Sequence, residues 1–280
     1  MRSAELGSFL MDHPRAIVAE LASVRGSSPR EQGAFMIIAP DALIGTIGGG
    51  ALEHMVIARA RKAMRGMMDV PLGPEIGQCC GGRAFVMLRV IVRADRERLF
   101  ASLRDAEALE PNIYIFGSGH VGKALARALA VLPVSVHVID TRPDELHDLP
   151  ASVEARAVPM PEAVVRAAPA GSAFVILTHD HALDFLIAAE ALKRADAPYV
   201  GMVGSHTKRA RFKSWYLSEA GGDAANLRRL VLPIGAFGLV DKRPEVIAAL
   251  AAAEIMVQIG RREASILRVP ETVTSGADIG

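Results

Sequence analysis

Cysteine is scarce in this chain: Cys79 and Cys80 are the two cysteines among 280 residues. Two thiols cannot build a disulfide framework, so the sequence suits a reducing compartment and a cytoplasmic location is expected. The two cysteines are adjacent, and α-carbons joined by a trans peptide lie about 3.8 Å apart, whereas ordinary disulfides need roughly 4.4 Å or more. A structural disulfide between them is therefore not expected.

Long apolar runs and excess charge of one sign are also missing. No stretch reaches about 18 uninterrupted apolar residues, and the N-terminus carries Glu5 and Asp12, so neither a membrane span nor a secretory signal is expected. The longest apolar stretch, residues 246–260, contains Glu254 and predicts a buried helix. The formal net charge of +1 gives no basic field, so neither nucleic acid nor a membrane is an expected partner.

The length predicts two domains, and the sequence pattern changes near residue 110. Residues 1–110 hold short strands and glycine-rich turns, which predict a smaller N-terminal α+β domain. Residues 111–262 alternate strand and helix, which predicts an α/β domain with a Rossmann-like, doubly wound parallel sheet. Residues 263–280 are expected to form a tail.

The expected elements follow from the apolar patterns. In the first domain they are a hairpin (34–40 and 42–47), a helix after a glycine turn (48–66), a strand (83–93) and a helix (95–109). In the second domain the expected strands are 112–117, 134–140, 155–160, 173–178, 199–204 and 230–235.

The most informative motif is the run Gly117, Gly119 and Gly122, spaced G-x-G-x-x-G between an expected strand and an expected helix. Asp140 ends the next strand, which completes the context of a dinucleotide-binding fingerprint. The glycines allow a tight turn, close approach of an anion and close helix packing, and the helix N-terminus favours phosphate. His120 lies inside the turn and is expected to face the ligand. The alternative is a Rossmann-type turn that binds nothing.

A second polar segment, Thr178, His179, Asp180 and His181, follows strand 173–178. It therefore lies at the carboxyl edge of the sheet, where open α/β folds bind ligands. We expect a polar edge that faces the ligand. The alternatives are that Thr178 or Asp180 caps the next helix, or that the two histidines bind a metal.

A third segment, with Ser205, His206, Lys208 and Arg209, follows the next strand. Basic residues at a helix N-terminus favour a phosphate or carboxylate ligand, and the alternative is a solvated first turn.

The turn formed by Gly48, Gly49 and Gly50 also opens a helix and can present amides to an anion. Glu53 in the first helical turn equally suits the helix dipole, which leaves a structural role open.

Cys79 and Cys80 lie between Gln78 and a glycine pair. In an extended chain, neighbouring side chains point to opposite faces. We therefore expect one cysteine to contact a ligand or metal centre and the other to be buried as a small hydrophobic residue.

Eight motifs, in this order, resemble the xanthine dehydrogenase accessory proteins of the XdhC type: SSPREQGAFMII, GTIGGGALE, GQCCGG, IFGSGHVGKALA, VIDTRPD, ILTHDHALD, GMVGSHTKRARF and LPIGAFGL. The resemblance spans about residues 16–260. It implies an accessory chaperone rather than an enzyme. Such proteins bind and protect the molybdenum cofactor (molybdopterin). They work with a cysteine desulfurase that sulfurates it, and they deliver it to an apo molybdenum hydroxylase of the xanthine dehydrogenase type. A homodimer is also implied.

The resemblance assigns roles to the motifs. The glycine turns would hold the cofactor phosphate, and Thr178, Asp180 and Ser205 would read its polar edges. A thiolate near molybdenum is reasonable because sulfur is a soft ligand, with Cys79 the first choice and Cys80 the second. Three alternatives stay open: an NAD(P)-dependent oxidoreductase that uses the Gly117–Gly122 turn, a metallohydrolase, and a scaffold that binds no cofactor.

Overall fold

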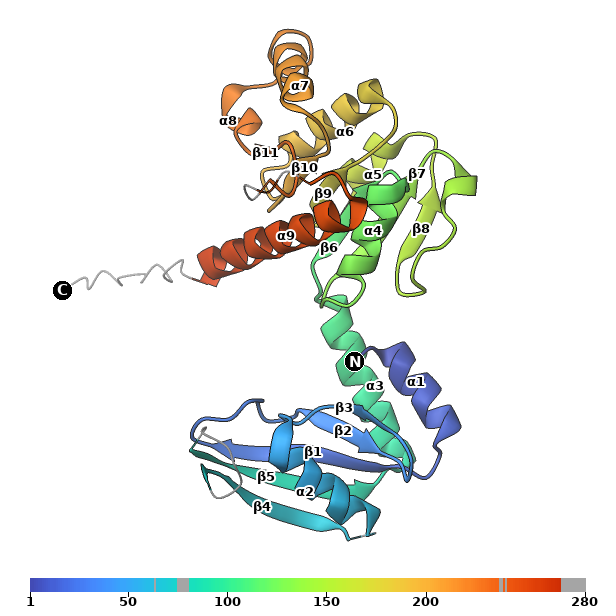
Figure 1. Cartoon of the computed structure of the whole chain (residues 1–280), viewed down its shortest axis with the longest axis vertical. Coiled ribbons are helices and arrows are strands. Elements are labelled where there is room, and N and C mark those ends of the chain that lie inside the picture. Colours follow the sequence, from blue (N-terminus) through green and yellow to red (C-terminus); the bar gives the residue numbers. More distant parts are fainter. Residues whose placement is uncertain (63, 75–80, 237–238, 240, 268–280) are drawn as a thin grey trace, which may run out of the picture. The chain divides into compact units, whose positions relative to one another are not determined.

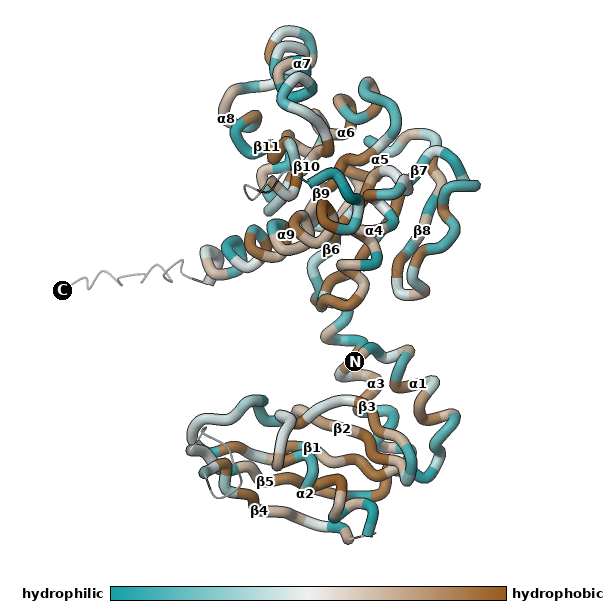
Figure 2. The backbone as a smooth tube through the Cα atoms, in the orientation of Figure 1, coloured by the Kyte–Doolittle hydropathy of each residue, from teal (hydrophilic) through white to brown (hydrophobic). Residues whose placement is uncertain are grey.

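The computed structural model describes residues 1–62, 64–74, 81–236, 239 and 241–267, and the chain divides into two compact units, Met1–Ala108 and Leu109–Gly280 (Figure 1). Hydrophobic residues are concentrated on the strands of both sheets (Figure 2). No helix in the described part of the chain is long and apolar enough to cross a membrane.

The first unit is built on a five-stranded antiparallel sheet with the order β3-β2-β1-β5-β4. Its strands are β1 (Ile17–Arg25), β2 (Phe35–Ile38), β3 (Leu43–Gly45), β4 (Gly66–Leu72) and β5 (Gly82–Val90). The expected hairpin (β2 and β3) and the expected strand at residues 83–93 (β5) are confirmed.

Helices cover both faces of this sheet. Helix α2 (Gly50–Arg61) buries Leu52 and Val56 against one face, while α1 (Ser3–Asp12) and α3 (Arg93–Ala108) cover the other. The central strand β1 is therefore buried on both sides: Ala19 and Leu21 face α2, and Val18 faces α1 and α3. A strand covered on both faces loses the polar alternation that marks a half-exposed strand, and β1 was not predicted.

The second unit contains a six-stranded parallel sheet with the order β11-β10-β9-β6-β7-β8. Its strands are β6 (Asn112–Phe116), β7 (Ser135–Asp140), β8 (Glu154–Ala157), β9 (Ala173–Ile176), β10 (Val200–Met202) and β11 (Leu230–Val231). Counted along the chain this is the order 3-2-1-4-5-6 of dinucleotide-binding sheets, and the Rossmann-like prediction is confirmed. The strand order reverses between β6 and β9, which marks the position where ligands bind in such sheets.

Helices lie on both faces of the parallel sheet (Figure 1). One face packs against α4 (His120–Leu129) and α9 (Pro244–Leu267), and the other packs mainly against α5 (Pro161–Ala167), α6 (His181–Lys193) and α7 (His206–Ser218). A short helix, α8 (Ala224–Leu227), precedes β11.

Several predicted boundaries were wrong. The helix expected over 48–66 ends at Arg61, and the strand expected over 155–160 ends at Ala157. Helix α9 continues to Leu267, so the tail expected from residue 263 begins inside a helix, because Arg262, Glu263 and Ala264 favour helix. Strand β11 ends at Val231 instead of residue 235, since Pro233 has no amide hydrogen to extend a strand ladder.

We expect Gly122→Ala to destabilise the second unit. An added Cβ would lie 2.0 Å from the Gly117 carbonyl oxygen, and backbone must move to relieve that overlap. Overpacking of this kind costs about 1–3 kcal/mol in the free energy of unfolding, measured by urea denaturation. The control is Gly260→Ala in α9, where no heavy atom is found within 4 Å in the described chain. Equal unfolding midpoints for the two variants would contradict the expectation.

Candidate functional site

The first glycine of the fingerprint brings two strand ends together. Gly117 follows β6 with a φ of 110°, a conformation that favours glycine. A Cβ at this position would lie 2.4 Å from the Leu177 carbonyl oxygen and 2.9 Å from the Thr178 amide nitrogen, just after β9. Two segments singled out in the sequence, the glycine turn and the segment 178–181, thus meet where the strand order reverses.

The other two glycines have opposite surroundings. At Gly122 an added Cβ would overlap the Gly117 carbonyl, which explains the close seat of α4 on the turn. A Cβ added at Gly119 would have no described heavy atom within 4 Å, apart from its chain neighbours. Gly119 is also the N-cap of α4, and within the described chain this end has neither a capping side chain nor an acidic residue in the first turn. A ligand phosphate can approach the turn at Gly119.

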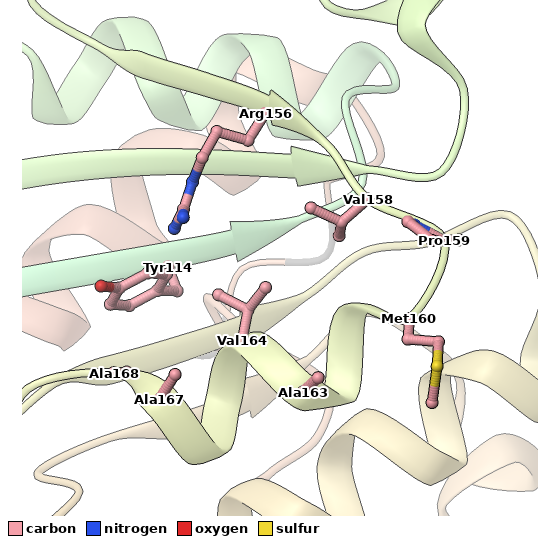
Figure 3. Close-up of a pocket in the computed structure, with 9 residues that line it drawn as sticks. All are labelled: Tyr114, Arg156, Val158, Pro159, Met160, Ala163, Val164, Ala167 and Ala168. Atoms are coloured by element: carbon pink, nitrogen blue, oxygen red, sulfur yellow. The ribbon is translucent and has the colours of Figure 1, made fainter.

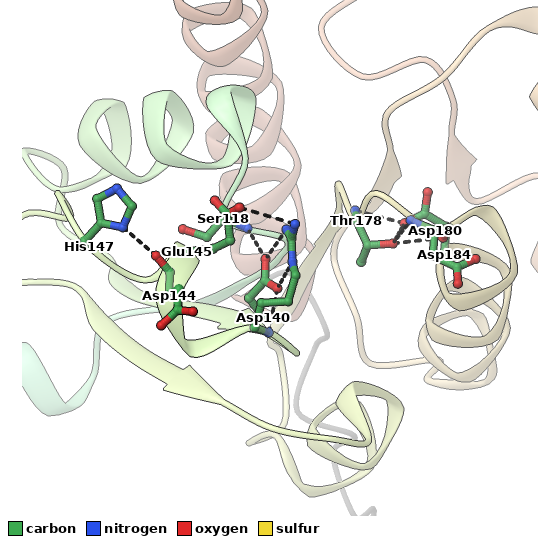
Figure 4. A network of polar contacts seen from close by, with 9 residues as sticks. Ser118, Asp140, Asp144, Glu145, His147, Thr178, Asp180 and Asp184 are labelled. Carbon is green, nitrogen blue, oxygen red and sulfur yellow. Dashed lines mark hydrogen bonds and ion pairs between the residues drawn. The ribbon is translucent and has the colours of Figure 1, made fainter.

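Asp140 ends β7 as expected, but its carboxylate is occupied by its own neighbours (Figure 4). It accepts hydrogen bonds from the Ser118 amide at 2.8 Å, the Arg142 amide at 3.0 Å and Arg142 Nε at 3.2 Å. Burial alone would raise the pKa of Asp140, but these donors outweigh it and the pKa lies below its ordinary value. The side chain therefore fixes the glycine turn instead of standing open for a ribose.

Arg142 is a site residue that the sequence analysis missed. Its half-exposed guanidinium bridges Asp140 and Glu145, with Nη1 3.3 Å from Glu145 Oε1. An arginine near this acidic position accommodates the 2′-phosphate of NADP in dinucleotide sites. Arg142 follows Asp140 by two positions, so this rule applied to the sequence would have identified it.

Lys208, which was expected to contact a ligand, is paired within the fold. Its ammonium donates to the carboxylate of Asp184 and, at 2.9 Å, to the Val203 carbonyl. Asp184 is fully buried and also accepts from the Thr178 amide at 3.0 Å and the Thr178 hydroxyl at 2.7 Å. Because a buried charge needs a partner, the ammonium is committed to this carboxylate. Asp184, which the sequence analysis did not single out, joins α6 and α7 to the ends of β9 and β10.

Several other predicted ligand contacts are structural. Asp180 caps α6 by accepting from the Ala182 amide at 2.8 Å, and Ser205 caps α7 by accepting from the Lys208 amide at 3.3 Å. The Arg209 guanidinium donates to the Leu232 carbonyl at 2.7 Å and so holds the segment after β11. The capping alternative thus describes Asp180 and Ser205 as the structure has them.

Three histidines remain exposed after the neighbouring strands β6, β9 and β10: His120, His179 and His206. His181, the first residue of α6, is exposed as well. Among the described residues, no group of three or more histidine, cysteine, aspartate or glutamate side chains is placed to hold a metal ion. This edge of the sheet therefore presents Gly119, Arg142 and imidazoles, but no metal-binding cluster in the described chain.

The second glycine turn lies in the first unit, and a carboxylate of the helix that follows it binds its amides. Gly48, Gly49 and Gly50 have φ angles of 136°, 78° and 60°. The Glu53 carboxylate accepts from the Thr46 hydroxyl at 2.6 Å and the Ile47 amide at 3.0 Å. Burial would raise the pKa of Glu53, but these donors and the Gly48 and Gly49 amides lower it. The sequence analysis expected the amides of this turn to face a ligand anion. In the structure the Glu53 carboxylate accepts hydrogen bonds from them.

Described residues of three predicted motifs, GQCCGG, SSPREQGAFMII and GTIGGGALE, meet at the end of the antiparallel sheet where Gly82 begins β5. An added Cβ at Gly82 would lie 2.0 Å from the Ser27 carbonyl oxygen, and one at Gly48 would lie 2.7 Å from Pro29 Cγ. The Gly81 amide donates to the Leu72 carbonyl at 2.8 Å, which closes the connection from β4 to β5. Cys79 and Cys80 belong to that connection and lie outside the described residues.

A separate cavity of about 440 Å³ lies between β8 and α5 (Figure 3). Arg156 reaches from β8 toward the ring of Tyr114, and Val164 and Met160 form the opposite side. Tyr114 also stacks on His137, with ring centroids 4.5 Å apart. None of the predicted site residues that the structure describes lines this cavity.

Comparisons with known proteins match both units. Residues 113–255 match the family model of the XdhC Rossmann domain, and residues 10–69 match the model of the XdhC and CoxI family. The chain is 26% identical over 254 residues to the uncharacterized protein YqeB of Escherichia coli, covering 85% of this chain and 42% of YqeB. It therefore spans about two fifths of that curated relative.

Solved structures give a likeness of fold. A xanthine dehydrogenase structure from Bacillus halodurans superposes with a TM-score of 0.69 at 20% identity, covering 94% of this chain and 96% of that chain. The Escherichia coli tRNA N6-threonylcarbamoyladenosine dehydratase TcdA reaches a TM-score of 0.41 at 15% identity, with 64% and 100% of the two chains covered. A score that low does not establish a shared fold.

We expect Lys208→Ala to lower the free energy of unfolding by about 3–5 kcal/mol, because it leaves the buried Asp184 carboxylate without its cation. The matched control is Lys213→Ala on the exposed side of the same helix, with a change within about 0.5 kcal/mol. Urea denaturation measures both. A stable Lys208→Ala protein that has lost only ligand binding would show that the ammonium serves the ligand.

We expect Glu53→Gln to weaken the first unit by about 1 kcal/mol at pH 7, because a charged acceptor is replaced by a neutral one. The folded-state pKa of Glu53 is lowered, so its stabilisation is present above the ordinary pKa near 4.3 and is lost as pH falls through the lower folded value. The difference from wild type should therefore shrink below about pH 4. Exposed Glu31→Gln is the control, and a difference that is independent of pH would contradict this role.

Proposed function

Because the chain belongs to the XdhC and CoxI family, we propose that it binds the molybdenum cofactor, protects it, supports its sulfuration and inserts it into a molybdenum hydroxylase of the xanthine dehydrogenase type. Family membership supports a role in xanthine dehydrogenase maturation as an accessory protein instead of an enzyme. The apo hydroxylase, a cysteine desulfurase, a homodimeric state and a cytoplasmic location belong to the same proposal.

The observation that carries the proposal is the carboxyl edge of the parallel sheet. Gly119 faces open space at the N-terminus of α4, and the guanidinium of Arg142 lies on Asp140, which binds the same turn. Backbone amides, a helix N-terminus and a guanidinium are the groups that hold a phosphate, and the molybdopterin cofactor carries one. The exposed imidazoles of His120, His179 and His206 supply polar contacts for the rest of a ligand.

Molybdenum is a soft metal, and a thiolate is the ligand type that suits it. Within the proposal, Cys79 is the first choice for that contact and Cys80 the second. The protein's own task is then differential affinity. It holds the cofactor at a partly open edge and releases it when a more enclosed site in a partner becomes available.

A second candidate rests on the strand order and the complete fingerprint. Both are those of dinucleotide-binding sheets, so NAD(P) is the alternative ligand of the same edge. Since Arg142 pairs with Asp140, the phosphorylated form, NADP, is favoured over NAD. This would make the chain an NAD(P)-dependent oxidoreductase. A scaffold without any ligand is the third reading.

The test is anaerobic binding of isolated molybdenum cofactor to the full chain. We expect near-stoichiometric binding by wild type and at least a tenfold loss in Gly119→Val, whose side chain would enter the space through which a phosphate approaches. Gly119 has a φ of −74°, so valine is tolerated there. Gly260→Val, which also points into open space, is the matched control.

Further variants and titrations separate the readings. Cys79→Ala and Cys80→Ala identify the thiol, and equal retention by both would contradict a role for either. Absence of cofactor binding by wild type would contradict the chaperone proposal. Saturable binding of NADPH with turnover of a carbonyl substrate would then favour the oxidoreductase, and no binding of either ligand would favour the scaffold.

A further inference from the structure

The first unit contains a groove of about 580 Å³, and none of its described lining residues is among the candidate site residues predicted from the sequence. We call it the arginine groove. Its described lining consists of Arg15, Ile17, Ile38, Ala39, Pro40, Ala60, Arg61, Arg65 and Val90. A volume of this size is typical of sites for small ligands, which fall at about 300–1,000 Å³.

The floor of the arginine groove follows from the strand register. Ile17 of β1 pairs directly with Ile38 of β2 on one side and with Val90 of β5 on the other. Directly opposed residues of antiparallel strands point to the same face, so the three side chains form an apolar row across the sheet. Ile38 belongs to the core under α2, which places this row on the face that α2 covers.

The row is left partly open because α2 is shorter than the strands beneath it. Its 12 residues span about 18 Å, whereas the nine residues of β1 or β5 span about 30 Å. Helix α2 begins beside the Gly48 turn and ends at Arg61. The groove therefore begins where the helix stops, at the opposite end of the sheet from Gly82.

The rim carries three guanidinium groups from different segments. Arg15 precedes β1, Arg61 ends α2 and Arg65 precedes β4. All three side chains are exposed, and within the described chain none has an ion-pair or side-chain hydrogen-bond partner. Four other arginines of this unit form ion pairs: Arg83 with Asp69, Arg89 with Glu20 and Asp95, Arg93 with Glu97, and Arg98 with Glu20. The three rim arginines differ from the remaining arginines without an ion pair in the described part of the chain in that they surround one groove.

Helix stability explains only one of these cations. A basic residue in the last turn complements the helix dipole, which accounts for Arg61. Arg15 and Arg65 lie outside α2 and gain nothing from it. Three like charges around one groove repel one another, and no acidic residue is among the described lining residues. The groove is electrostatically complementary to an anion.

We propose that the arginine groove binds a small organic phosphate monoester, with its apolar body on the Ile17 row and its phosphate between the guanidiniums of Arg61 and Arg65. Guanidinium groups recognise phosphate oxygens in pairs, and a planar or branched apolar body matches the row of β-branched side chains. The nine described residues that line the groove are fewer than the roughly 20–30 residues a side of a specific protein interface, which favours a small ligand. The proposal rests on different residues from those that carry the cofactor proposal above.

The test uses isothermal titration of the full chain with 1-naphthyl phosphate, beside inorganic phosphate and 1-naphthol. We expect 1-naphthyl phosphate to bind at least tenfold more tightly than either comparator, because each of those lacks one half of the ligand. Arg61→Ala and Arg65→Ala should each weaken binding about tenfold, as expected for loss of one charge-assisted hydrogen bond. Arg65→Lys should lose less, because it keeps the charge but not the paired donors.

The matched control is Arg93→Ala, which removes a highly exposed arginine of the same unit outside the groove and should leave binding unchanged. Absence of 1-naphthyl phosphate binding, or equal binding by wild type and the Arg61→Ala/Arg65→Ala double variant, overturns the proposal. Tighter binding of a hexaglutamate peptide than of 1-naphthyl phosphate also overturns it, because the occupant would then be an acidic protein segment.

Discussion

The carboxyl edge of the parallel sheet depends on two glycines, Gly117 and Gly122, because neither carries a Cβ. Without a Cβ at Gly117, the end of β6 can lie against the backbone of Leu177 and Thr178, and without one at Gly122, α4 can lie against the turn. Both contacts involve backbone atoms, so moving side chains could not make room for a Cβ at either position. The position of Gly119, and with it the approach for a phosphate, follows from these two close contacts.

Charge in this protein is largely used inside the fold. Glu53 fills the glycine turn of the first unit, Asp140 holds Ser118, and Lys208 is bound by Asp184. Each of these groups belongs to a motif of the type that binds external ions in other proteins. What remains for a ligand is the set of cations and imidazoles that neighbouring groups of the described chain do not fully occupy. The surface groups that can bind a ligand are therefore those that the internal pairs leave unused.

The sequence predicted the parallel sheet well because strand and helix alternate there, and each βα unit is local in the chain. It did not predict β1 or β4. Strand β1 is covered on both faces, and β4 carries Pro71 and polar Asp69 at the sheet edge, so neither shows a regular alternation. These strands are defined by their partners across the sheet, and β1 pairs with β5 more than 60 residues away (Leu21 with Val86).

The position of the parallel strand ends at one edge of the sheet was predicted for the same reason. Strand ends place residues at one edge of the sheet whatever their side chains do, so Gly117, Thr178 and Ser205 were located correctly at that edge. Their partners were not predictable. Asp184 lies a full helical turn beyond Asp180 and looks like any helical acid in sequence, yet its burial captures Lys208. The resemblance to a family does not tell which polar groups are already bound within the fold.

Helix α9 has a consequence for the way the chain is made. Its residues Ala251, Ile255 and Ile259 complete the core beneath α4, on the same face as Leu125 and Leu129. The glycine turn at Gly117–Gly122 precedes these residues in the chain and is synthesised before them. Until α9 is present, α4 lacks the apolar contacts that Ala251, Ile255 and Ile259 add to this core. The core around α4 is therefore completed only after α9 has been synthesised.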